Sequence, residues 1–519
     1  MLLSASGPHE ILLATANAKY HHASLSLRCL HANLGPYQGR AAFLEFTIGD
    51  AAADIAEQIL RAAPRLLGLS VYLWNVELLT EVVQILKTLA PGLVVVIGGP
   101  EVSHDLAGLR IARLADYVVQ GEGESAFQAL CAAVLSGNAP PGKVIPGGLP
   151  ALAQLVFPYD AYTDRDLQQR TLYVEASRGC PYSCEFCLSA LDTQVRHFPI
   201  DALLQQFQRL LDRGARHFKF IDRTFNLQIE WSARILRFFL ERHQPGVLYH
   251  FELVPDRLPE GLRSIIAEFP PGSLQFEVGV QTLNEAVGRR ISRRQNLTKM
   301  ADNFRFLREQ THAHVHADLI VGLPGETLES FGAGLDRLHA MGPQEIQVGI
   351  LKKLRGAPIA RHDAEWAMVY STTPPYEVLQ TSVLDFSTIQ RLKRFAFVWD
   401  RLVNRGNFSH TAPLLWGAGG PFAPVLAFSD ALYAANGQVH AISLDRLAEQ
   451  LYHHVLQLGV PLQQIQSALE ADYHASERLL PASLKGPAQA RAANPSDRHR
   501  RRQLKHQRGL ESEMINPTS

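Results

Sequence analysis

Three cysteines lie close together near the middle of the chain, Cys180, Cys184 and Cys187 in the segment Cys-Pro-Tyr-Ser-Cys-Glu-Phe-Cys. Thiolates with this spacing can converge on one soft metal centre, either zinc or an iron–sulfur cluster. A structural zinc site needs four ligands, and the sequence has no second Cys-x-x-Cys pair, so zinc would need a further ligand such as His197. A four-iron cluster held by three cysteines leaves one iron open for a substrate. The sequence therefore favours an open iron–sulfur centre, with zinc as the alternative.

The spacing Cys180-x-x-x-Cys184-x-x-Cys187, with the aromatic Phe186 before the last cysteine, resembles the signature of the radical S-adenosylmethionine (SAM) family. The resemblance extends over residues 171–360. It implies an enzyme whose [4Fe–4S] cluster, held by the three cysteines, cleaves SAM to a 5′-deoxyadenosyl radical. It also implies an electron donor such as flavodoxin or ferredoxin.

The same resemblance implies further contacts to SAM. The expected cofactor-binding residues are Phe186, Asp222, Glu277, Gln281, Asp318 and Gly322. Many relatives carry Gly-Gly-Glu near the methionine amino group, where this chain has Ile221-Asp222-Arg223 and departs from the pattern. Glu277 and Gln281 are expected to face the ribose or the methionyl carboxylate. Gly322 begins a Gly-Leu-Pro-Gly-Glu segment that resembles the adenine side of such sites. Structural salt bridges and a plain turn are the alternatives for these residues.

Strands and helices alternate around these positions, as expected for a barrel. The expected strands are residues 172–176, 217–221, 248–252, 274–278, 316–320 and 346–350. Eight strand–helix units close a full barrel, so this count predicts a partial, TIM-like (β/α)6 barrel over residues 171–360. The cysteines directly follow the first strand, and ligands of such folds gather at the carboxyl ends of strands.

The first part of the chain has short apolar runs separated by helical patterns, which predicts a parallel sheet covered on both faces. We therefore expect an α/β, doubly wound, Rossmann-like domain over residues 1–137, followed by a Pro- and Gly-rich linker over 138–170. No Gly-x-Gly-x-x-Gly follows its first strand, so a dinucleotide site is not expected. Gly98-Gly99 and Gly121-Glu122-Gly123 instead follow two neighbouring strands, where bare backbone leaves room for a large flat ligand.

Together with Ser70, these glycines resemble the cobalamin-binding domains that precede radical SAM barrels, including relatives of the anaerobic magnesium-protoporphyrin ester cyclase. The resemblance implies that the nucleotide tail and corrin of cobalamin are lined by Ser70, Gly98, Gly99, Glu122 and Gly123. The cobalt-ligating motif Asp-x-His-x-x-Gly is missing, although His21 and His22 lie near its place. Cobalamin without a histidine ligand is therefore expected, and a domain that has lost the cofactor is the alternative.

The remaining sequence and the composition bound the other expectations. The pattern of residues 361–478 predicts a mainly helical domain, which resembles an uncharacterised C-terminal extension of one subgroup of these proteins. Residues 479–519 lack periodicity and are expected to form a disordered tail. Fifty basic and fifty acidic residues cancel, which disfavours nucleic acid as a partner. No secretory signal or membrane-spanning run is recognised, so we expect a cytoplasmic protein with no membrane partner.

Taken with the two resemblances, these features imply a cobalamin-dependent methyltransferase that acts on an unactivated carbon of a small-molecule or peptide substrate. One alternative is a cobalamin-associated radical cyclase or rearrangement enzyme without methyl transfer. Another is a catalytically dead, cobalamin-binding regulator. The complete set of three cysteines argues against the regulator, since a binding protein has no need of an open iron.

Overall fold

The computed structural model describes residues 9–476 and 478–484. It divides into two compact units, residues 1–390 and residues from Arg391 onward, which are described separately. The sequence predicts a boundary at 360/361, thirty residues before this division. The expected tail, residues 479–519, lies outside the described residues except for 479–484.

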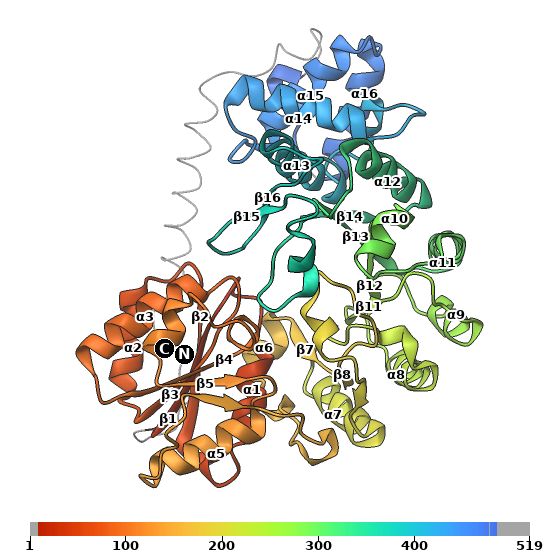
Figure 1. Cartoon of the computed structure of the whole chain (residues 1–519). Helices are drawn as coiled ribbons and strands as arrows, with labels where there is room; N and C mark the ends of the chain where they lie inside the picture. Colours follow the sequence, from red (N-terminus) through yellow and green to blue (C-terminus); the bar gives the residue numbers. More distant parts are fainter. Residues whose placement is uncertain (1–8, 477, 485–519) are drawn as a thin grey trace, which may run out of the picture. The chain divides into compact units, whose positions relative to one another are not determined.

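The first part of unit 1 is a six-stranded parallel sheet of order β2-β1-β3-β4-β5-β6 (Figure 1). Its strands are β1 (Ile11–Asn17), β2 (Ala41–Thr47), β3 (Leu66–Ser70), β4 (Val94–Gly98), β5 (Tyr117–Gln120) and β6 (Val144–Pro146). Its helices are α1 (Leu25–Ala32), α2 (Ala52–Ala62), α3 (Val76–Leu89), α4 (Arg110–Leu114) and α5 (Glu124–Leu135). The predicted doubly wound α/β domain is thus confirmed, and the segment predicted as a linker supplies its edge strand β6.

Alternate residues of β1 enter two separate hydrophobic cores. Leu12 and Ala14 pack in the core beneath α2, α3 and α4, whereas Ile11 and Leu13 pack in the core beneath α1 and α5. Successive side chains of a strand point to opposite faces, so a strand buried on both faces must be apolar throughout. This arrangement leaves the carboxyl ends of the strands as the place where polar and glycine residues gather.

The second part of unit 1 is a six-stranded parallel sheet of order β14-β13-β12-β11-β10-β7. The strands are β7 (Leu172–Val174), β10 (His217–Phe220), β11 (Leu248–Leu253), β12 (Leu274–Gln281), β13 (His314–Val321) and β14 (Glu345–Ile350). The helices are α7 (Ile200–Asp212), α8 (Ile229–Glu241), α9 (Glu260–Ala267), α10 (Glu285–Arg290), α11 (Leu297–Gln310) and α12 (Leu328–Met341). Strands β7 and β14 form the two edges, so the barrel is open, and the predicted partial barrel is confirmed.

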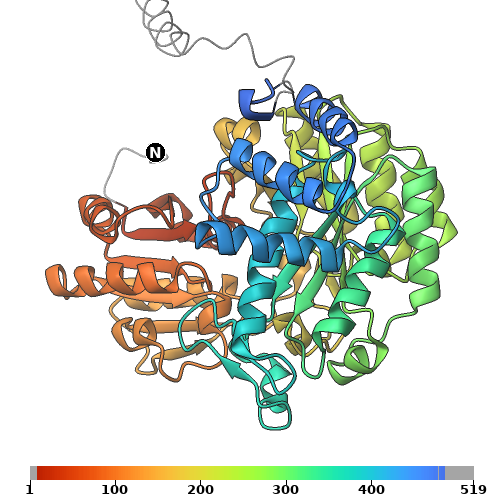
Figure 2. The same cartoon turned by 90° about the horizontal axis from the view of Figure 1, so that it is seen from above.

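The barrel helices lie outside the curved sheet, which is clearest from above (Figure 2). Burial alternates strictly along β12 and β13, because one face packs on these helices and the other face lines the interior of the barrel. The interior face carries polar residues such as Glu277 and Asp318. The polar residues are therefore placed inside the barrel by the strand period alone.

Short elements lie between the two large sheets in the chain and around the second one, and the strands among them form two separate two-stranded sheets. They are α6 (Asp164–Gln169), the antiparallel pair β8 (Ser177–Arg178) and β9 (Arg196–His197), and the hairpin β15 (Val369–Tyr370) and β16 (Val378–Gln380). Among the 3-10 helices are η1 (Gly35–Arg40), η2 (Pro100–Val102), η5 (Leu188–Leu191), η6 (Phe225–Leu227) and η7 (Pro358–His362). The β8–β9 ribbon brackets the segment that contains the three clustered cysteines.

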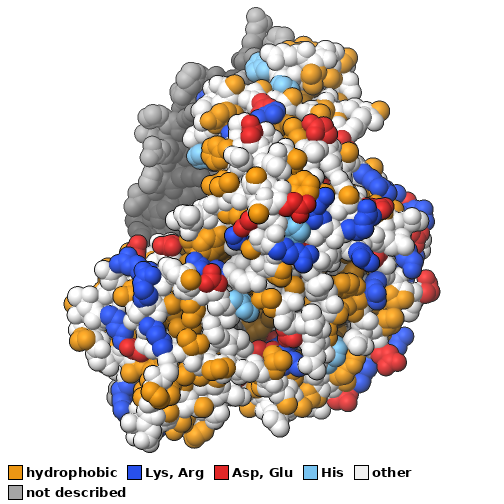
Figure 3. Space-filling model, in the orientation of Figure 1, with side chains coloured by type: hydrophobic (Ala, Val, Ile, Leu, Met, Phe, Trp, Pro, Cys, Tyr) orange, Lys and Arg blue, Asp and Glu red, His pale blue; other side chains and the backbone are white. Residues whose placement is uncertain are grey.

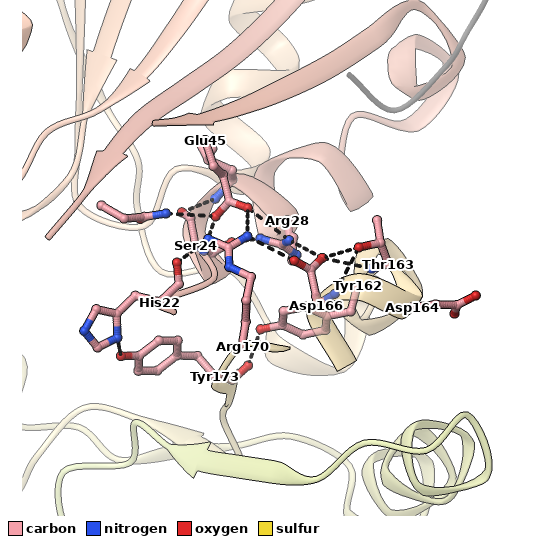
Figure 4. Close-up of polar contacts among 12 residues, drawn as sticks. His22, Ser24, Arg28, Glu45, Tyr162, Thr163, Asp164, Asp166, Arg170 and Tyr173 are labelled. Atoms are coloured by element: carbon pink, nitrogen blue, oxygen red, sulfur yellow. Dashed lines mark hydrogen bonds and ion pairs between the residues drawn. The ribbon is translucent and has the colours of Figure 1, made fainter. Parts of the chain in front are cut away.

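Buried charges join the first sheet to the segment that leads into the barrel (Figure 4). The guanidinium of Arg28, on α1, lies 3.2 Å from Glu45 and 2.9 Å from Asp166, which belong to β2 and α6. Arg170 contacts the same two carboxylates at 2.6 and 3.0 Å. Two cations and two anions therefore compensate one another in a buried site, where an unpaired charge would be strongly destabilising.

The second unit is mainly helical, as predicted. Helix α13 (Phe386–Trp399) begins just before the boundary and continues into a π-helical turn at Asp400–Asn404, and it is followed by α14 (Phe422–Asn436), α15 (Leu444–Gln457) and α16 (Leu462–Ala475). Buried Asp472 accepts hydrogen bonds from the backbone of His410 and from the Thr411 hydroxyl, at 2.8 and 2.6 Å. None of the described helices has the length and apolar character needed to cross a membrane.

Candidate functional site

The three clustered cysteines lie on a loop closed by backbone hydrogen bonds. The Cys180 amide donates to the Asp192 carbonyl at 2.9 Å, and the Cys187 amide donates to the Cys184 carbonyl at 3.1 Å. Cys180 and Cys184 are buried and Cys187 is half-buried. Gly179 precedes the loop with φ +92°, and a Cβ there would collide with the Gln194 carbonyl, so only glycine fits.

The donor set of this loop fits an iron–sulfur cluster. Among the residues that the structure describes, no group of three or more His, Cys, Asp or Glu is arranged to hold a single metal ion. A [4Fe–4S] cluster is larger than one ion and takes thiolates around its outside. Arg293 Nη1 donates to Cys184 Sγ at 3.4 Å, which places a positive charge beside the thiolates. His197, the fourth ligand in the zinc alternative, stacks instead on Trp231 with ring centroids 5.2 Å apart.

Asp222 fixes the backbone that leads into this loop. Its buried carboxylate accepts hydrogen bonds from the Ala176 amide at 2.9 Å and from the Ser177 hydroxyl at 2.5 Å. Burial raises the pKa of Asp222 to about 7. The residue also faces a cavity of about 270 Å³ lined by Pro181, His197 and others. The expected SAM contact of Asp222 remains a prediction, beside a structural role that the sequence did not reveal.

Glu277 is paired inside the barrel. Its carboxylate lies 3.2 Å from His250 Nε2 and 3.1 Å from Lys219 Nζ, on β11 and β10. These two neighbours, His250 most strongly, lower the pKa of Glu277 to about 2. Glu277 is therefore an anion held by the barrel at every physiological pH.

Asp318 differs from Glu277 because no cation pairs with it closely. Its Oδ1 atom is buried without a hydrogen-bond partner, and His316 lies 3.7 Å away. Burial, together with the charges of Glu277 and Glu252, raises the pKa of Asp318 to about 8. The barrel thus contains one carboxylate that ionises readily and one that tends to stay protonated.

Gln281 and Gly322 both have left-handed backbone conformations at strand ends. Gln281 has φ +70°, at a register shift between β12 and β13. Gly322 has φ +87°, and a Cβ there would lie 2.5 Å from Val378 Cγ1. Glycine is required at 322 for this close packing. Half-buried Phe186 lies on the cysteine loop. The contacts of these three residues to SAM remain predictions.

A cavity of about 720 Å³ lies between the first sheet and the barrel, within unit 1. All five cobalamin-binding candidates of the first domain line it: Ser70, Gly98, Gly99, Glu122 and Gly123. Its opposite wall comes from the barrel and includes Tyr173, Lys219, Arg223 and Glu252. Gly99 has φ +110°, and its missing side chain lets the backbone pack against Val71. The structure therefore brings residues of both domains around one space.

Several side chains of this cavity could not be assigned from the sequence. Trp74 is 49% exposed and stacks on Tyr72, with centroids 4.5 Å apart and planes inclined by 7°. The Tyr72 hydroxyl donates to Ser26 Oγ at 2.9 Å, and Ser26 Oγ lies 3.1 Å from Ser70 Oγ. The wall of the first domain thus combines bare backbone, an aromatic stack and a row of hydroxyls.

His22 also lines the cavity. Its Nδ1 atom lies 2.6 Å from the Tyr173 hydroxyl, across the boundary between the first sheet and the barrel. Burial lowers the pKa of His22 to about 4, so the ring is neutral at pH 7. Glu122 has partners as well, because its carboxylate accepts a hydrogen bond from Arg178 at 2.8 Å and is paired with Arg196.

The surface in Figure 3 carries both acidic and basic side chains over the face that is drawn. The balanced composition disfavours the strong positive field that nucleic-acid binding needs.

Family models match three successive parts of the chain. Residues 11–131 match the B12 binding domain, residues 174–338 match the radical SAM superfamily, and residues 364–516 match a protein of unknown function, DUF4080. The last match runs beyond the residues that the structure describes.

Two curated relatives are methyltransferases. The chain is 28% identical over 336 residues to the 2-(S-pantetheinyl)-carbapenam-3-carboxylate methyltransferase of Streptantibioticus cattleyicolor, covering 57% of this chain and 48% of the relative. It is also 28% identical, over 335 residues and with the same coverage, to the cobalamin-dependent radical SAM methyltransferase TokK of Streptomyces tokunonensis. The chain thus spans about half the length of these relatives.

Solved structures share the fold. The methyltransferase TsrM of Kitasatospora setae, solved with cobalamin and a [4Fe–4S] cluster, has a TM-score of 0.60 at 16% identity and covers 90% of this chain and 99% of its own. The cobalamin-dependent SAM radical enzyme OxsB has a TM-score of 0.60 at 12% identity. This match covers 91% of the present chain and 81% of OxsB. Three family models, for a B12 binding domain, the radical SAM superfamily and DUF4080, thus match successive parts of the chain, and the solved structures share its fold.

Proposed function

We propose that the protein is a radical SAM enzyme that uses cobalamin to methylate an unactivated carbon of a small molecule or peptide. The observation that carries this proposal is the cavity of about 720 Å³, which joins the glycine-lined end of the first sheet to barrel strands beside the cysteine loop. A substrate in this space would lie between the proposed cobalamin residues and barrel-side residues such as Arg178, two residues before Cys180; the three cysteines themselves do not line it. The two methyltransferases among the curated relatives, one of them named as cobalamin-dependent, support the same reaction.

In this proposal Cys180, Cys184 and Cys187 hold a [4Fe–4S] cluster and leave one iron for SAM. When bound, such a cluster would supply the electron for reductive cleavage of SAM; the chain's own part is to hold it through the three thiolates and to leave one iron open. Arg293 contributes a positive donor at Cys184 Sγ and also donates to the Gly279 carbonyl. It therefore connects the cysteine loop to strand β12.

Cobalamin would lie against Gly98, Gly99 and Gly123 and supply the methyl group. All three glycines line the large cavity, and Trp74 offers an exposed aromatic face on the same wall. The first domain then binds and orients the cofactor, while the cavity walls exclude bulk water from the reacting carbon.

The barrel residues would bind SAM and hold its orientation. We assign Phe186, Gln281 and Gly322 to this role because they lie on the cysteine loop or at strand ends. Asp318 has a buried oxygen without a protein partner, which supports a contact to a ligand that is present only in the loaded enzyme. Glu277 would act through its pairing with Lys219 and His250.

The remaining partners follow from the same chemistry. Reducing the cluster requires an electron donor, for which flavodoxin or ferredoxin is suited. All five cysteines are free thiols, which supports a reducing compartment such as the cytoplasm. The formal net charge of zero supports a partner other than nucleic acid.

The first experiment is anaerobic reconstitution of the full chain with iron and sulfide, followed by iron analysis and electron paramagnetic resonance (EPR). Wild type should hold four irons, whereas Cys184→Ala should lose the cluster. Cys131→Ala, at a buried cysteine of α5, serves as the matched control. A wild-type protein that takes up no cluster would favour the dead regulator instead.

The second experiment tests methyl transfer by product analysis with candidate substrates, titanium citrate as reductant and added hydroxocobalamin, so that every transferred methyl group must come from SAM. Methyl transfer should yield both 5′-deoxyadenosine and S-adenosylhomocysteine in a substrate-dependent way. Substrate turnover with 5′-deoxyadenosine alone would contradict methyl transfer and favour the cyclase or rearrangement reaction.

A further inference from the structure

One guanidinium joins the first domain to the cysteine loop. Arg178 lies on β8, two residues before Cys180, and its Nη1 atom donates to Glu122 at 2.8 Å. Its Nη2 atom donates to Glu124 at 2.7 Å and to Glu175 at 2.7 Å. Glu122 and Glu124 belong to the loop after β5 and the start of α5, whereas Glu175 follows β7. Arg178 therefore holds carboxylates from both domains at once.

A second arginine of the same ribbon reinforces this contact. Arg196 on β9 is the register partner of Arg178 on β8. It pairs with Glu122 from the other side and donates to the Pro150 carbonyl at 3.0 Å. We call Glu122, Glu124, Glu175, Arg178 and Arg196 the arginine clamp. Its two arginines belong to the ribbon that brackets the cysteines, so the clamp acts directly on the loop that carries them.

The charged side chains of the clamp are largely buried, so their hydrogen bonds hold a fixed geometry. The side chains of Glu124 and Glu175 are each 6% exposed and that of Arg178 is 15% exposed. Charge-assisted hydrogen bonds from a planar guanidinium have a fixed geometry, and buried charges must keep their partners. Lysine could supply the charge at 178 but not three simultaneous contacts in one plane. The geometry of the guanidinium therefore fixes the three carboxylates relative to one another.

Both ends of the clamp border the large cavity. Glu122, Glu124, Glu175 and Arg178 all line it, next to Gly123 of the proposed cobalamin site. Resting on the proposed function, we propose that Arg178 is a positioning residue that sets the separation between the cobalamin site and the cysteine loop. In this role Glu122 acts through Arg178 and Arg196, and the contact of Glu122 to corrin that the sequence suggested is not needed. A fixed separation matters because the methyl donor and the radical must reach the same carbon.

The test compares wild type, Arg178→Gln and Arg178→Lys, with Glu124→Gln as a milder variant that leaves Arg178 two carboxylates. Arg263→Gln is the matched control, because Arg263 is 19% exposed and pairs with Asp302 within the barrel, outside the cavity. Each full-length protein is loaded with cobalamin and cluster, and both centres are reduced to paramagnetic states. Pulsed EPR then measures their dipolar coupling and hence the distribution of cofactor separations.

We expect Arg178→Gln to broaden or shift this distribution and Arg178→Lys to restore it in part, while Arg263→Gln matches wild type. A distribution in Arg178→Gln equal to that of wild type would overturn the inference, even if the variant were less stable. Failure of wild type to take up cobalamin would instead count against the proposed function.

Hydrogen exchange of the cofactor-free proteins tests the clamp without bound cofactors. It therefore applies even if wild type takes up no cobalamin, or if a variant binds less cofactor than wild type. Loss of the clamp should increase exchange both in residues 121–127 and in residues 178–187, and the Arg263→Gln control should leave both segments unchanged. Equal protection of the two segments in Arg178→Gln and wild type would contradict the clamp.

Discussion

The imidazole of His362 lies 2.6 Å from the carboxylate of Glu185, although the two residues are 177 positions apart. Glu185 stands between Cys184 and Phe186 and is only 2% exposed. It also accepts a hydrogen bond from Ser292 Oγ at 2.6 Å and pairs with Arg361. The segment that follows the barrel therefore contacts the cysteine loop through Glu185, a residue that is not itself a metal ligand.

Replacing Glu185 with Gln should destabilise the protein and hinder cluster assembly. The change leaves buried His362 and the neighbouring Arg361 without their anion, and breaking a buried pair of this kind costs about 3 kcal/mol. Urea unfolding of the cofactor-free protein measures the loss, and iron content after reconstitution measures its effect on the loop. Glu285→Gln, at an exposed pair with Arg289, should change the free energy of unfolding by less than about 0.5 kcal/mol. Equal effects of the two substitutions would show that Glu185 does not hold the loop.

Gly99→Ala should damage the first domain. Gly99 has φ +110°, and a Cβ would lie 2.5 Å from the Val71 carbonyl oxygen, so alanine forces both strain and a backbone shift. We expect a loss of about 1–3 kcal/mol in the free energy of unfolding, together with weaker binding of hydroxocobalamin. Gly142→Ala is the control, since a Cβ at 142 meets nothing within 4 Å. If alanine is accepted at 99 without loss, the close approach to Val71 is not needed.

The parallel sheets could be predicted because their strands are apolar on both faces or alternate regularly. Strand β4 (Val94–Gly98) is an uninterrupted apolar run that ends in glycine, and its neighbours β3 and β5 are largely apolar with a polar last residue. Strand β6 (Val144–Pro146) was assigned to the linker instead. It lies at the edge of the sheet within a segment rich in proline and glycine, where proline is tolerated and strand signals are weak.

The cluster cysteines could be identified because their spacing is local, within eight residues. The pairings of Arg178 with Glu122, and of His362 with Glu185, join residues 56 and 177 positions apart. No periodicity connects such positions, and only the packed structure brings them together. The position of Glu122 just after a predicted strand correctly placed it at the cavity. The two arginines that compensate its charge could not be identified from the sequence.

Trp74 should report cobalamin binding by fluorescence. Its ring is 49% exposed and lies on the wall of the large cavity, stacked on Tyr72. Cobalamin absorbs in the emission range of tryptophan, so titration with hydroxocobalamin should quench wild-type emission. Trp74→Phe should remove a larger share of the quenching than Trp231→Phe, whose ring lies in the smaller cavity beside His197. Equal quenching in the two variants would place the bound cobalamin away from Trp74.

The pKa of Asp318 predicts how stability changes with pH. Burial raises this pKa to about 8, with Glu277 and Glu252 adding to the effect. The unfolded chain releases the same proton near pH 4, so from about pH 4 to 8 the folded protein binds a proton that the unfolded chain lacks. The stabilisation from protonated Asp318 is thus complete below pH 4 and declines until about pH 8.

Asp318→Asn stays neutral and should remove this decline. The difference in the free energy of unfolding, variant minus wild type, should rise by on the order of 1 kcal/mol per pH unit between pH 5 and 7. Measuring the difference cancels the similar contributions of Asp222 and Glu326, whose pKa values burial raises to about 7. Gln205→Asn, at an exposed position without a titratable group, should show a flat difference over the same range. A flat difference for Asp318→Asn as well would mean that Asp318 is ionised in the folded protein, and that its unpartnered oxygen meets water or a cation instead.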